Sequence, residues 1–158
     1  MTLDFNDAGG RVIPTGTTAK VRCEIVRGDA GSDGILTRSK SNPNVLYLLL
    51  RLTVVGGKFD GEVFYDRIGV KGKEEGDDDR YAAIGRERIR KILDASHGYH
   101  PHDTSPEAVE SRRIESYNDL NGLVFSVSIG VKDSQNVVAR VITPDDPAYK
   151  DVMADAPF

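Results

Sequence analysis

The sequence predicts an all-β fold with one helix. Five separate segments have the length and composition of strands, and those at 19–25 and 123–131 place apolar residues at every second position, which is typical of half-buried strands. One segment, residues 81–96, instead places its apolar residues at helical spacing along a narrow stripe. The 16 glycines and 7 prolines supply turns between these segments, and a chain of 158 residues suits one domain with a modest core.

Each expected strand has an apolar face and a polar face. The five strands are expected at residues 19–25, 44–55, 62–70, 123–131 and 137–143. In the second strand the leucines at even positions face the core, and Tyr47 and Arg51 face outward. In the third strand Tyr65 and Arg67 face outward for the same reason.

The helix falls between the third and fourth strands, and Gly98 suits the position just beyond its end. The order β-β-β-α-β-β is that of an OB-fold five-stranded β-barrel. An open α+β sandwich capped by the helix is the alternative. We expect an N-terminal lead-in at residues 1–16, the OB-fold domain at 17–143 and an acidic tail at 144–158. Within the domain, residues 28–43 and 100–116 are expected to be irregular.

Segments 52–66, 83–89 and 119–127 together resemble a family of bacteriophage single-stranded DNA-binding proteins. The shared pattern is a strand ending in a Gly-containing turn before a helix, followed by an L-x-G turn that opens a strand. The likeness covers residues 14–143, and it implies an OB-fold that binds single-stranded DNA without sequence preference in replication or recombination.

The C-terminus resembles the acidic tip of bacterial single-stranded DNA-binding proteins. Asp151, Asp155, Pro157 and Phe158 match that tip, although its acids are sparser here and Ala156 stands where the family has isoleucine. The resemblance implies that the tail recruits replication and recombination proteins and competes with DNA.

The net charge of −4 is unevenly distributed. Residues 74–79 carry −5 and residues 144–158 carry −3, which leaves +4 on the rest of the chain. A mildly basic body with acidic appendages can still attract phosphates.

A surface for single strands needs basic side chains that follow the phosphates and aromatic rings that stack on bases. The outward faces of the second and third strands combine both kinds. The expected nucleic-acid-binding residues are Lys20, Arg22, Arg38, Lys40, Tyr47, Arg51, Tyr65, Arg67, Lys71, Lys73 and Arg140.

Catalytic and metal sites are not expected. The histidine-rich loop at 97–103 lacks a paired ligand motif, and the acidic run at 74–79 is contiguous, whereas nuclease carboxylates converge from separate elements. We therefore expect no enzyme activity, no cofactor and no metal. The single Cys23 fits a buried thiol in the cytoplasm, and no membrane span is expected. A homo-oligomer is compatible with the strand edges.

Two other functions remain open. The first is a protein-interaction or structural OB module of a virion or assembly, without nucleic-acid binding. The second is a metal-dependent enzyme that uses the histidine loop.

Overall fold

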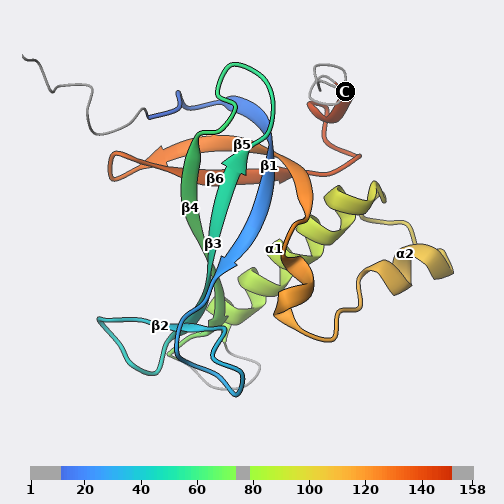
Figure 1. The fold of residues 1–158 in the computed structure, drawn as a ribbon. Coiled ribbons are helices and arrows are strands. Elements are labelled where there is room, and N and C mark those ends of the chain that lie inside the picture. Colours follow the sequence, from blue (N-terminus) through green and yellow to red (C-terminus); the bar gives the residue numbers. More distant parts are fainter. Residues whose placement is uncertain (1–11, 74–78, 151–158) are drawn as a thin grey trace, which may run out of the picture.

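The computed structural model describes residues 12–73 and 79–150 (Figure 1). The strands are β1 (Thr17–Val26), β2 (Thr37–Arg38), β3 (Leu46–Val54), β4 (Val63–Lys71), β5 (Val124–Lys132) and β6 (Gln135–Ile142). The helices are α1 (Arg80–His97), α2 (Pro106–Ser111) and the short 3₁₀ helix η2 (Tyr117–Leu120). The expectation of a mostly β fold with one main helix is confirmed.

All strand pairs are antiparallel and form one open, curved sheet. β1 lies between β3 and β5, β4 pairs with the other side of β3, and β6 pairs with β5. β2 pairs with the first two residues of β3, which β1 does not reach. In Figure 1, β5 and β6 run across the direction of β3 and β4. The order of neighbours is therefore β4-β3-β1-β5-β6, with β2 beside the start of β3.

The core lies on the concave side of this sheet and is closed by α1. It is built from the inward residues of the five long strands, together with Ile92 and Leu93 of the helix. The helix packs tightly against β4 because both elements carry glycine at the crossing. A Cβ added at Gly85 would lie 1.8 Å from the carbonyl oxygen of Gly69, so any larger residue at Gly85 would collide with the strand.

Both ends of α1 are capped. The carboxylate of Asp79 accepts hydrogen bonds from the N–H of Ala82 at 3.0 Å and from the N–H of Gly72 at 2.8 Å. The second bond also ties the helix start to the end of β4. Gly98 ends the helix in the left-handed region, with φ of 78°. The predicted helix and its C-terminal glycine are confirmed.

Two expected irregular segments contain regular structure. Residues 28–43 include β2, and residues 100–116 include α2, whose first turn begins at Pro106 after the Ser105 cap. Arg112 fixes the second segment to α1. Its Nε donates to the buried carboxylate of Asp94 at 2.7 Å, and one of its Nη atoms donates to the carbonyl of Asp103 at 2.7 Å.

Within the part of the chain that the structure describes, no helix is both long and apolar enough to cross a membrane.

Candidate nucleic-acid interface

The convex face of β1, β3 and β4 brings together side chains that the sequence placed on separate strands. The strand register sets them in rows across the sheet. Glu24 lies opposite Arg51, and Arg51 lies opposite Tyr65 on the next strand. One row away Arg22 lies opposite Thr53. We call this surface, formed by Arg22, Glu24, Leu49, Arg51, Thr53, Val63, Tyr65 and Arg67, the outer face.

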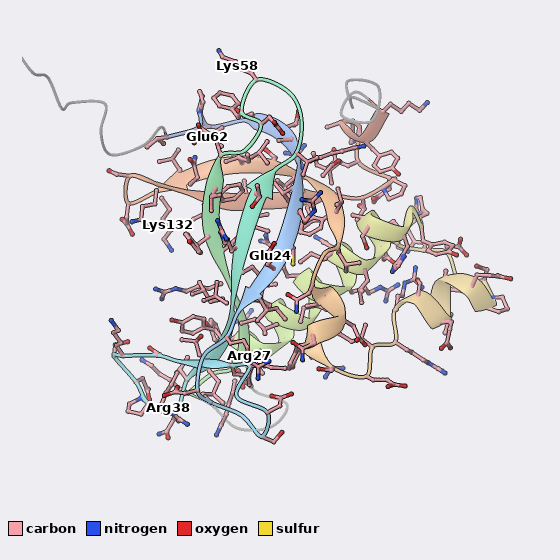
Figure 2. All side chains as sticks on the ribbon, in the orientation of Figure 1. Glu24, Arg27, Arg38, Lys58, Glu62 and Lys132 are labelled. Atoms are coloured by element: carbon pink, nitrogen blue, oxygen red, sulfur yellow. The ribbon has the colours of Figure 1, made fainter. Side chains whose placement is uncertain are left out.

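The outer face is cationic and carries an accessible aromatic ring. Arg22, Arg51 and Arg67 are exposed, and none of them forms an ion pair with another described residue. Tyr65 is 51% exposed. Glu24 is the one acid among the residues that define this face. Figure 2 labels Glu24, which lies close to the C-terminal end of β1. The outer face therefore carries three guanidinium groups, one exposed tyrosine and one carboxylate. Arg51 and Arg67 are neighbours of Tyr65, whereas Arg22 lies two strands away from it.

Tyr47 lies on the expected side of β3, but it is only 8% exposed. The guanidinium carbon of Arg67 stands 4.8 Å from the centroid of its ring, a cation–π arrangement. The Tyr47 ring therefore packs against the Arg67 guanidinium, and that face of the ring is not open to a base. Tyr47 is therefore on the outward side of β3, as expected, but it is buried, whereas Tyr65 is exposed.

A second accessible tyrosine, Tyr81, belongs to the same surface although it comes from α1. Its ring lies where the side chain of residue 69 would be, since a Cβ on Gly69 would come within 2.7 Å of it. Tyr81 remains 39% exposed. Burial raises the pKa of its phenol, and the positive charge of Arg67 acts in the opposite direction. The sequence analysis missed Tyr81; its only sequence signal is the glycine at the outward position 69.

The remaining predicted basic residues fall into two groups. Arg38, Lys40, Lys71 and Lys73 are exposed where β2, β3 and β4 meet their loops, and in Figure 2 Arg38 lies at the opposite end of the sheet from Lys58.

Lys20 lies on the same side of β1 as Arg22 and Glu24, whereas Arg140 lies on β6. Lys20 is half-buried and lies opposite Ser126 of β5. Arg140 donates from Nε to Asp146 at 2.8 Å, an ion pair that lowers the pKa of Asp146. Arg140 is therefore already engaged. The predicted tail residues Asp151, Asp155, Pro157 and Phe158 lie outside the described residues.

A groove with a volume of about 910 Å³ lies between α1 and residues 112–117. It is rich in arginine, but most of these charges are matched locally. Arg112 pairs with Asp94, and Arg90 approaches the same carboxylate at 3.7 Å. Arg113 lies 3.7 Å from Glu110. This groove therefore offers less uncompensated positive charge than the outer face.

The other reactive side chains do not form a site. Cys23 is buried, and desolvation, followed by the nearby charge of Glu24, raises the pKa of its thiol to about 12. The rings of His100 and His102 lie 5.5 Å apart. Within residues 12–73 and 79–150, no group of three or more His, Cys, Asp or Glu side chains is arranged to hold a metal ion.

Comparison with protein-family models, curated proteins and solved structures gives no match for this chain.

Proposed function

We propose that this protein binds single-stranded DNA on the outer face without strong sequence preference and acts in replication or recombination. The observation that carries the proposal is that Arg22, Arg51 and Arg67 share one exposed face with Tyr65 on three paired strands. None of the three arginines forms an ion pair with another residue that the structure describes. Guanidinium groups bind phosphates, and an exposed ring stacks on any base.

We further propose that the sheet is an OB-type barrel. The pairing order supports this, because the first strand lies between the second and fourth while the helix connects the third to the fourth. β4 and β6, the two outer strands of that order, also approach each other: the N–H of Val138 donates to Asp66 at 3.0 Å. OB barrels bind oligonucleotides on the face formed by their second and third strands, which correspond here to β3 and β4.

In this proposal each group has a separate role. Arg22 and Arg51 neutralise phosphates, and Tyr65, which lies beside Arg51 on β4, stacks on a base. Arg67 is held over the Tyr47 ring, so its guanidinium is already oriented and loses little conformational freedom when it meets a phosphate. Binding of this type is stoichiometric: the protein covers exposed strands and protects them.

The tail proposal rests on the sequence resemblance alone. Asp151, Asp155, Pro157 and Phe158 would recruit replication or recombination proteins, with the aromatic ring in an apolar pocket and the acids on basic side chains.

The test is a titration of the protein into fluorescent oligo-dT and into a matching duplex, over a range of salt concentrations. We expect preferential binding to the single strand, with log affinity falling linearly with log salt. Arg51→Gln should weaken binding and reduce the salt slope by about 0.7, the value for one lost phosphate contact on a single strand. Arg86→Gln, the same change at an exposed position on α1, is the matched control and should leave the slope unchanged.

An absence of single-strand binding at micromolar protein would overturn the proposal. A protein-interaction module would then be the better reading, because Val63 and Tyr65 expose apolar surface on the same face.

A further inference from the structure

We propose that the groove beside Tyr81 binds one nucleobase of the strand that crosses the outer face. This inference rests on the proposed function and extends it to a site that the sequence pattern did not indicate. The groove has a volume of about 420 Å³ and lies between the β2–β3 connection and the start of α1. Its size falls within the range of small-ligand sites.

The groove meets the outer face at Tyr81, which lines the groove and also covers Gly69 of β4. Tyr65, Arg67 and position 69 occupy successive outward positions of that strand, so Tyr65 and the Tyr81 ring over Gly69 are separated by about 14 Å along it. Arg67 lies between them. A strand whose base stacks on Tyr65 and whose phosphate meets Arg67 would therefore be led toward Tyr81.

The lining offers groups for a base and, at the exposed Lys73 and Arg80, positive charge for a phosphate attached to it. Tyr81 and Val45 offer apolar surface, while Ser39, Ser41 and Asn42 offer hydroxyl and amide groups for the base edges. Asp79 also lines the groove, but both of its oxygens already accept backbone N–H groups. We therefore assign the base to the apolar and uncharged polar part of the groove, and its phosphates to the cations Arg67, Lys71, Lys73 and Arg80.

The first measurement is photocrosslinking of the intact protein to oligo-dT that carries one 5-iododeoxyuridine at a series of positions. Trypsin releases residues 81–86 as a peptide in which Tyr81 is the single aromatic residue. Crosslinks to this peptide are expected from one oligonucleotide position, and crosslinks to the peptide with Tyr65 from a position a few nucleotides away.

The second measurement is affinity. Tyr81→Leu should weaken oligo-dT binding about tenfold, the effect of one lost stacked base. Tyr117→Leu, which changes a tyrosine of the other groove, should change affinity less than twofold. Because Tyr81 packs on Gly69, circular dichroism must show that Tyr81→Leu is folded. If the variant is unfolded, the crosslinking result on the intact protein is the test of the inference.

Three outcomes separate the two proposals. Crosslinks to the Tyr81 peptide, with weaker binding by a folded Tyr81→Leu variant, support the inference. Tight single-strand binding with crosslinks to Tyr65 but none to Tyr81 overturns the inference and leaves the proposed function standing. No single-strand binding at all overturns the proposed function, and the inference fails with it.

Discussion

Replacing Glu24 by glutamine should increase the affinity for single strands. Glu24 is the one acid on the outer face and lies opposite Arg51 in the strand register. Taking about 7 Å, a typical separation of groups on neighbouring strands, between the Glu24 carboxylate and a phosphate bound by Arg51, two unit charges repel by about 0.6 kcal/mol in water. Removing that repulsion corresponds to an affinity about threefold higher at low salt.

The assay is an anisotropy titration of fluorescent oligo-dT at low and at high salt. Because the Debye length is about 10 Å at 0.1 M and about 3 Å at 1 M, the gain should be present at low salt and disappear near 1 M. Glu107→Gln is the matched control, since Glu107 is exposed on α2, which is not part of the outer face. A gain of affinity is informative because partial unfolding does not produce it.

An unchanged or lower affinity of a folded Glu24→Gln protein at low salt would refute the placement of phosphates beside Arg51. An equal gain from Glu107→Gln would show that net charge, and not the outer face, controls binding.

Three further predictions concern stability and reactivity. Gly85→Ala should lower the free energy of unfolding in urea by about 1–3 kcal/mol or more, because its Cβ would collide with the carbonyl of Gly69; an unaltered midpoint would contradict the helix–strand contact. Cys23 should not react with a thiol reagent in the native protein at pH 8, since its pKa of about 12 and its burial leave almost no accessible thiolate, whereas it should react fully in urea. Arg112→Leu should destabilise the protein by about 3–5 kcal/mol because it leaves the Asp94 carboxylate buried without its hydrogen-bonding partner; a second change, Asp94→Asn, should restore part of that loss.

The strands and the main helix could be predicted because each buries one face against a single core. Alternation along β1 and β3 marked Val21, Cys23, Leu48 and Leu50 as inward residues, and all four are buried. The helix was marked by its apolar stripe and by Gly98. In these segments local pattern and tertiary burial agree, so periodicity is sufficient.

The accessibility of the aromatic residues could not be predicted in the same way. Alternation gives the side of the sheet on which Tyr47 lies, but not the Arg67 guanidinium from β4 that lies over its ring, nor Tyr81 of α1, which is near enough for its pKa to respond to Tyr47 and Arg67. Both interactions join residues far apart in the sequence. The short helix α2 was missed for a different reason: six residues are too few to show a helical period, although Ser105 followed by Pro106 was a readable start signal.

Asp66 is a polar residue at an inward position of β4, and its hydrogen bond joins this strand to β6. The strand pattern calls for an apolar residue there, between Phe64 and Ile68, and desolvation raises the pKa of this carboxyl. Its Oδ2 nevertheless accepts the N–H of Val138 at 3.0 Å, while Arg88 of α1 lies 3.9 Å from it and donates to the carbonyl of Val138 at 3.4 Å.

The backbone of Val138 is thus bonded by side chains from β4 and α1, next to the irregularity in the β5–β6 register. An apolar residue at position 66 would fit the core but would leave the Val138 N–H without its acceptor, a loss of about 1–3 kcal/mol. Asp66, the polar residue among the inward residues of β4, therefore joins β4 to β6. It also fixes the segment of strand from which Tyr65 and Arg67, the residues on either side of Asp66, project onto the outer face.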